Sequence, residues 1–77
     1  MATKNIVLTV EPQLITSKAA YIQSNGGVFK FKFSQSTPND LENSHTDTKL
    51  YQDGSLGPVY AWKNAFQDVT LTVSEAI

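Results

Sequence analysis

The 77-residue sequence contains no cysteine. Disulfide bonds therefore cannot hold its core, and thiolate metal sites and thiol nucleophiles are excluded as well. No apolar run approaches the roughly 20 residues that a membrane-spanning helix needs, and the first five residues lack the apolar segment of a signal peptide. We therefore predict a protein that is made in a cytoplasm and has no membrane anchor.

Charge is also scarce, with six basic residues against seven acidic ones and a net charge of -1. The sequence contains no run of residues of like charge, which argues against both nucleic acid and a membrane surface as partners. A chain of this length buries only about 60% of its unfolded surface, so its own core is thin. Without disulfides, oligomerisation is the ordinary way to add buried surface.

Strict alternation of apolar and polar residues is the clearest pattern present. It places Val69, Leu71 and Val73 on one face of a strand near the C-terminus. The run from 28 to 33 alternates in the same way, with the three Phe residues on one face and the two Lys residues on the other. We predict that the centre of the core consists of Phe29, Phe31, Phe33, Val69, Leu71 and Val73.

Further strands are expected at 5–10, 13–17, 19–23, 48–51 and 59–63, separated by turns rich in Gly, Pro and Asn. The N-terminal strand should lie near the C-terminal one, since both alternate alike. Residues 34–47 are read as a long loop. The chain is thus predicted to be a single all-β domain over residues 1–77. Its fold is a small antiparallel β-sandwich or barrel, jelly-roll-like, with little or no helix.

The interleaved Phe and Lys residues at 29–33 resemble the base-stacking strands of single-strand nucleic-acid binders. On a flat strand, however, the rings and the ammonium groups point to opposite faces. Core packing is therefore the better interpretation, and no nucleic-acid partner is predicted.

The long loop gathers Asp40, Glu42, His45 and Asp47, which include oxygen and imidazole groups able to bind a divalent metal. Their spacing matches no known metal-binding loop, so a solvated loop is preferred. For catalysis, His45 would need a nucleophile such as Ser36 or Ser44 and an orienting acid such as Asp47, and any polar loop offers as much. We predict no enzyme activity, no catalytic residue, no metal and no cofactor.

Three aromatic residues leave alternatives open. Tyr60 and Trp62 share one face of their strand and Val59 and Ala61 share the other, and either face can be the buried one. Tyr51 raises the same question on the preceding strand. Tyr51, Tyr60 and Trp62 are therefore either part of the core or candidate contacts with another subunit or a ligand.

Several segments, taken in order, resemble short structural proteins of tailed bacteriophages and prophages. They are the strand and Gly turn of 20–27, the Phe-Lys strand of 29–34, Leu50–Gly54, the Tyr-Ala-Trp strand of 59–62 and the ending Thr70–Ala76. The resemblance covers most of residues 19–76, and the acidic loop departs from it.

This resemblance implies a virion component, such as a capsid decoration or head-fibre protein, made in the host bacterial cytoplasm. It also implies a symmetric homo-oligomer, first of all a trimer, bound to phage capsid or tail proteins.

Two other classes of function remain. A carbohydrate-binding or adhesin module would use Tyr60, Trp62 and the loop of 34–47 to hold sugars. A fimbrial-type subunit is suggested by the Asn5–Val10 segment, which reads like a donor strand.

Overall fold

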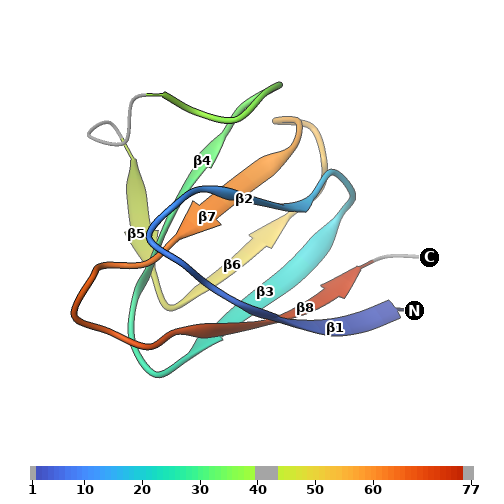
Figure 1. Cartoon of the computed structure of the whole chain (residues 1–77). Helices are drawn as coiled ribbons and strands as arrows, with labels where there is room; N and C mark the ends of the chain where they lie inside the picture. Colours follow the sequence, from blue (N-terminus) through green and yellow to red (C-terminus); the bar gives the residue numbers. More distant parts are fainter. Residues whose placement is uncertain (1, 40–43, 76–77) are drawn as a thin grey trace.

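The computed structural model describes residues 2–39 and 44–75, and every regular element in them is a β-strand. Two four-stranded antiparallel sheets pack face to face, so the predicted small β-sandwich is confirmed (Figure 1). No helix in the described ranges is long and apolar enough to cross a membrane. The strands are β1 (Ala2–Val7), β2 (Gln13–Thr16), β3 (Ala20–Asn25), β4 (Phe29–Phe33), β5 (His45–Asp47), β6 (Lys49–Gln52), β7 (Val59–Trp62) and β8 (Thr70–Glu75).

Among the described strands, six of the seven consecutive pairs lie in different sheets, and two of these connections are corners at the sheet edges, one between β1 and β2 and one between β5 and β6. Sheet A has the strand order β1-β8-β3-β6 and sheet B has the order β2-β7-β4-β5. The edge strands β1 and β2 are consecutive, and so are the edge strands β5 and β6 at the opposite side. Pro12, which has no amide hydrogen, lies at the first corner. At the second corner the Asp47 carboxylate accepts the backbone N–H of Thr48 at 2.7 Å.

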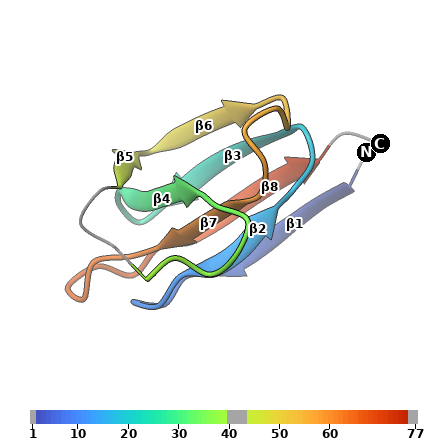
Figure 2. The same cartoon turned by 90° about the horizontal axis from the view of Figure 1, so that it is seen from above.

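The first strand pairs with the last. β1 and β8 are antiparallel with Ala2 opposite Glu75 and Val7 opposite Thr70, so the start of β1 and the end of β8 lie side by side (Figures 1 and 2). This is the neighbourhood expected from their shared alternation. The strand ends at Val7 and does not continue to Val10, because the chain then turns towards sheet B. Being paired to its own β8, β1 is not the free donor strand that a fimbrial subunit would present.

The core lies between the inner faces of the two sheets. Phe29, Val69, Leu71 and Val73 are almost fully buried, Phe31 is buried, and Phe33 is half-buried against the same cluster. The ring centroids of Phe29 and Phe31 are 5.4 Å apart, and those of Phe31 and Phe33 are 6.0 Å apart in a T-shaped arrangement. Full burial of one such side chain stabilises the fold by roughly 1.5–3 kcal/mol. The remaining buried apolar members are Leu8, Ile15, Ala20, Ile22, Val59 and Ala61.

The predicted loop of 34–47 is wrong over its last residues, which form β5 and pair with β4. All three residues of β5 are exposed, so no apolar alternation marks the strand. Its pairing rests on backbone hydrogen bonds at the edge of sheet B, which a purely polar segment makes equally well. Asp40 and Glu42 lie outside the described residues.

Candidate functional site

Trp62 does not lie at the surface. Its side chain points to the outer face of sheet B, opposite to Val59 and Ala61, yet it is only 3% exposed. The chain that follows β4 crosses the outer side of this sheet (Figures 1 and 2), and Pro38 within it is buried. Tyr60 is half-buried on the same face. Trp62 is therefore unavailable as the stacking residue of a sugar site.

Tyr51 lies on the opposite side of the molecule and is 70% exposed. It is paired across strands with Tyr21, which is 42% exposed, on the outer face of sheet A. The next rows of this face hold hydroxyl and amide groups. Thr72 donates its hydroxyl hydrogen to Asn5 Oδ1 at 3.0 Å. Sheet A thus presents two tyrosines beside a polar surface that also includes the exposed Lys49, which is paired with Gln23.

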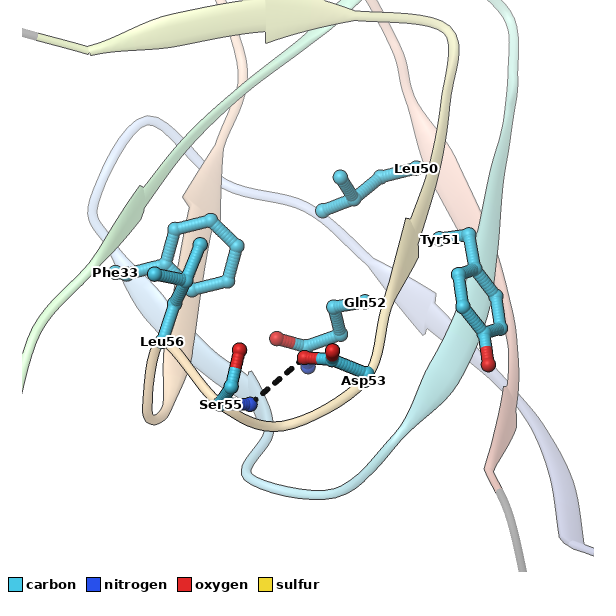
Figure 3. A pocket seen from close by; sticks show the side chains of 7 residues that line it. All are labelled: Phe33, Leu50, Tyr51, Gln52, Asp53, Ser55 and Leu56. Atoms are coloured by element: carbon cyan, nitrogen blue, oxygen red, sulfur yellow. Dashed lines mark hydrogen bonds between the residues drawn. The ribbon is translucent and has the colours of Figure 1, made fainter.

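A pocket of about 360 Å³ opens beside Tyr51, at the seam between the two sheets. Figure 3 shows β6 on one side of it and the turn that follows β6 on the other, with the Phe33 ring at the end of β4. Its walls are mainly apolar, and its polar groups come from the short segment 51–55. The lining residues of this seam pocket are Phe33, Leu50, Tyr51, Gln52, Asp53, Ser55 and Leu56.

Gln52 forms the buried polar part of the seam pocket and is only 5% exposed. Its Nε2 donates a hydrogen bond to the backbone oxygen of Lys18 at 3.0 Å. This hydrogen bond fixes which carboxamide atom of Gln52 is the nitrogen, because a flipped carboxamide would place Oε1 against the Lys18 carbonyl oxygen. Gln52 Oε1 has no hydrogen-bond partner, and Figure 3 shows it turned to the side of the pocket where Phe33 and Leu56 lie.

Asp53 shapes the turn at the rim of the pocket. Its Oδ1 accepts the backbone N–H of Ser55 at 2.9 Å, drawn as a dashed line in Figure 3. Hydrogen bonds from the Ser55 side chain and backbone hold the pKa of the Asp53 carboxyl below its usual value. Gly54 follows with φ +90°, a conformation that favours glycine. The rim of the pocket therefore carries a fixed carboxylate.

Phe66 is the most exposed apolar side chain in the described residues, at 99%. It belongs to the segment 63–69 between β7 and β8, here called the Phe66 loop. The turn between β6 and β7, which borders the seam pocket, and the Phe66 loop lie at opposite ends of the sandwich (Figures 1 and 2). The long axis of the molecule measures 34 Å.

The backbone of the Phe66 loop is tied down on several sides. Lys63 Nζ donates to the backbone oxygen of Gln67 at 2.8 Å and pairs with the Asp68 carboxylate at 3.9 Å. Two backbone hydrogen bonds join the loop to the segment after β1. The Lys63 N–H donates to the Thr9 carbonyl oxygen at 2.9 Å, and the Leu8 N–H donates to the Val69 carbonyl oxygen at 3.0 Å. The loop is therefore held against the end of β1.

The β3–β4 turn braces the loop from another side. Gly26 has φ +99°, and a Cβ added there would lie 2.1 Å from the Asp68 backbone oxygen. A Cβ added at Gly27 would lie 2.9 Å from Oε1 of the Gln67 side chain. A loop fixed in this way presents the Phe66 ring without hiding it.

Glu75 organises a polar cluster at the other end of the sandwich. It is placed on the inward side of β8, and its carboxylate accepts a hydrogen bond from the hydroxyl of Thr16 in sheet B. Lys4 Nζ lies 3.6 Å from the same carboxylate. The pKa of Glu75 is lowered chiefly by the bond from Thr16; desolvation opposes this shift, and the charges of Lys4 and Lys18 add to it.

Of the acidic and histidine groups in the predicted loop, the structure describes His45 and Asp47. In the described ranges, no three His, Cys, Asp or Glu residues are grouped so as to hold a metal ion. The His45 ring stacks on Phe31 with centroids 5.2 Å apart. Asp47 is engaged in the corner to β6, as described above. His45 therefore packs on the core and Asp47 stabilises a turn.

Comparison of the chain with protein-family models, with curated proteins and with solved structures finds no match. The site is therefore interpreted from its own geometry.

The seam pocket and the Phe66 loop were missed in the sequence. The pocket depends on which strands border the seam, which no local pattern reveals. Phe66 could have been noticed, since it is a large apolar residue among the turn-forming residues Asn64–Asp68.

Proposed function

We propose that this chain is a non-enzymatic structural protein of a tailed-bacteriophage particle, a capsid decoration protein that acts as a symmetric homo-oligomer. The observation that carries the proposal is the complete exposure of Phe66 on a braced loop. A rigid backbone that presents a bare aromatic ring is suited to insertion into a partner surface. The location in a virion comes from the sequence resemblance, whose segments form β3, β4, β6, β7 and β8.

Further support comes from the apolar surface near the Phe66 loop. Val7 is 71% exposed and Val10 is 49% exposed, and both flank the residues that hold the loop to the end of β1. Exposed apolar side chains close to the loop favour contact with another protein. Phe29 and Phe31 point into the core, so they are not offered to nucleic-acid bases. We accordingly propose capsid or tail proteins, and neither nucleic acid nor membrane, as partners.

Two measurements test this function. The first is the mass of the purified chain by sedimentation across a concentration series, which should show a closed oligomer, with a trimer as the first expectation. The second is co-sedimentation with empty capsids assembled from the major capsid protein of the same phage genome. Binding that saturates at a fixed ratio to capsid subunits supports the proposal. A monomer that stays in the supernatant at saturating capsid concentration contradicts it.

A second candidate, carbohydrate binding, is favoured by the exposed Tyr21 and Tyr51 pair on sheet A. Tyrosine rings supply an apolar platform with a polar end, and the neighbouring Thr72 and Asn5 supply hydroxyl and amide groups. Chemical-shift mapping with a panel of oligosaccharides tests it, with Tyr51→Ala as the matched variant. Chemical-shift changes at Tyr21 that vanish in the variant would support sugar binding. The absence of any chemical-shift change in sheet A would exclude this candidate.

A further inference from the structure

We propose that the Phe66 loop of one copy inserts its ring into the seam pocket of a second copy, so that the chain assembles head to tail. This inference rests on the homo-oligomer proposed above and specifies its contact. Both halves of the contact occur on the same chain: an aromatic ring that is 99% exposed, and an apolar hollow next to Tyr51 and Leu56.

The pocket has room for the ring. A protein cavity of about 150 Å³ is enough to bind benzene. The seam pocket measures about 360 Å³, so it accommodates a phenyl ring and part of the loop that carries it. Phe33 and Leu50 supply apolar walls, and Leu56, itself 67% exposed, would gain cover from the inserted ring.

Charge does not oppose the contact strongly. The Phe66 loop has one cation and one anion, and Lys63 faces Asp68 at 3.9 Å, so the loop is close to neutral. The pocket contributes the single carboxylate of Asp53 at its rim. The remaining repulsion, between Asp53 and the exposed Asp68, is screened by salt. Association should therefore strengthen as salt is added, as apolar contacts also do.

The positions of the two features decide the geometry of assembly. Because the loop and the pocket lie at opposite ends of the sandwich, the contact joins two different surfaces, and each added copy leaves one loop and one pocket free. Growth then stops only when a ring closes, and the expected trimer is one such ring.

A single contact of this kind is weak. One aromatic side chain buries about 150–250 Å², whereas a stable interface buries about 800 Å² on each partner. The latter is about a sixth of the 4675 Å² accessible surface of the chain. In a closed ring or on a symmetric particle, several such contacts form together. The high effective concentration of each partner then raises the overall affinity.

Complementary variants test the contact directly. Phe66→Glu removes the ring, and Leu56→Glu blocks the pocket; both positions are exposed, so the fold should survive. Each variant alone should be monomeric by sedimentation from micromolar to millimolar concentration. An equimolar mixture should form a heterodimer, because the ring of the Leu56→Glu chain still meets an intact pocket on the Phe66→Glu chain. Leu14→Glu, at an exposed site on β2 outside both features, should associate like the wild type.

The outcomes separate the contact from the function. A wild-type oligomer that Phe66→Glu leaves intact would overturn this inference and leave the proposed oligomer standing. A mixture that remains monomeric up to millimolar concentration, where even a single weak contact should form, would do the same. A wild-type chain that is monomeric throughout the series would overturn both this contact and the homo-oligomer.

Discussion

Thr16 of β2 donates its hydroxyl hydrogen to the carboxylate of Glu75 of β8, and the bond joins sheet B to sheet A. Thr16 is buried, and the Glu75 side chain is only 16% exposed. Lys4, on the neighbouring β1, lies 3.6 Å from the same carboxylate. The ionised Glu75 carboxylate therefore links β1, β2 and β8 at the end of the sandwich where β1 starts and β8 ends.

The first prediction concerns acid stability. The folded protein lowers the pKa of Glu75, so the ionised carboxylate stabilises the fold at pH values above the unfolded pKa of about 4.3. That stabilisation is lost as the pH falls through the lower pKa of the folded state. Glu75→Gln cannot titrate and lacks this contribution. The difference in free energy of unfolding between wild type and variant should be constant at neutral pH and shrink on acidification below about 4.3.

Urea denaturation at a series of pH values measures this difference. Asp53, whose pKa is also lowered, is present in both proteins and cancels in the comparison. A difference that stays constant down to about pH 2 would contradict the role of Glu75, since the unfolded carboxyl is then fully protonated.

The second prediction compares two glycines with positive φ. Gly26→Ala combines the backbone strain of φ +99° with a Cβ placed 2.1 Å from the Asp68 backbone oxygen. Gly54→Ala at φ +90° has similar strain, but its Cβ would find the nearest atom, the Ala19 nitrogen, at 3.5 Å. Strain of this kind costs about 1–3 kcal/mol, and the clash should make Gly26→Ala the more damaging variant. Thermal and urea unfolding of both proteins tests the order, which equal losses would refute.

The third prediction contrasts two phenylalanines. Phe29→Ala empties a fully buried site at the centre of the core and should destabilise the chain by about 3–5 kcal/mol. Phe66→Ala removes a ring that contacts solvent, and it should change stability by no more than about 0.5 kcal/mol at concentrations where the chain is monomeric. Equilibrium denaturation of dilute protein measures both. A large loss for Phe66→Ala would mean that the ring packs within its own chain.

The fourth prediction uses the single tryptophan as a reporter. Trp62 is 3% exposed, so its emission should be blue-shifted in the folded protein and poorly quenched by acrylamide. Unfolding in urea should shift the emission to the red and restore quenching in one transition. Oligosaccharides should leave the folded spectrum unchanged even if sheet A binds them, because the indole is buried against the outer face of sheet B, on the opposite side of the molecule. Efficient quenching of the native protein would contradict its burial.

Alternation of residue types was a reliable guide where one face of a strand is apolar and the other is polar. It led to β4 and β8 and to their inward residues, and it suggested that the first strand lies near the last. It could not orient β7, because Val59 and Ala61 on one face and Tyr60 and Trp62 on the other are all apolar or aromatic. It also could not reveal β5, which is polar throughout and pairs through its backbone.

The candidate site was less accessible to such reasoning. The seam pocket is lined by β6 of sheet A and by the end of β4 of sheet B, which are too far apart in the sequence for any local pattern to relate them. The burial of Gln52 follows from its bond to the Lys18 carbonyl, 34 positions away in sequence. Relations of this kind are set by long-range packing, so a local pattern contains no trace of them.

The pairing of the first two strands with the last two has a consequence for synthesis. β1 pairs with β8 and β2 pairs with β7, so neither N-terminal strand has its partner until the final part of the chain has been made. At about 5–20 residues per second, the interval between β1 and β8 is on the order of 4–14 s. During that time Ile6, Leu8 and Ile15 remain without the members of the core cluster that β7 and β8 supply. The sandwich can thus close only once β7 and β8 have been made, and β1 and β2 are the part that a ribosome-associated chaperone would meet first.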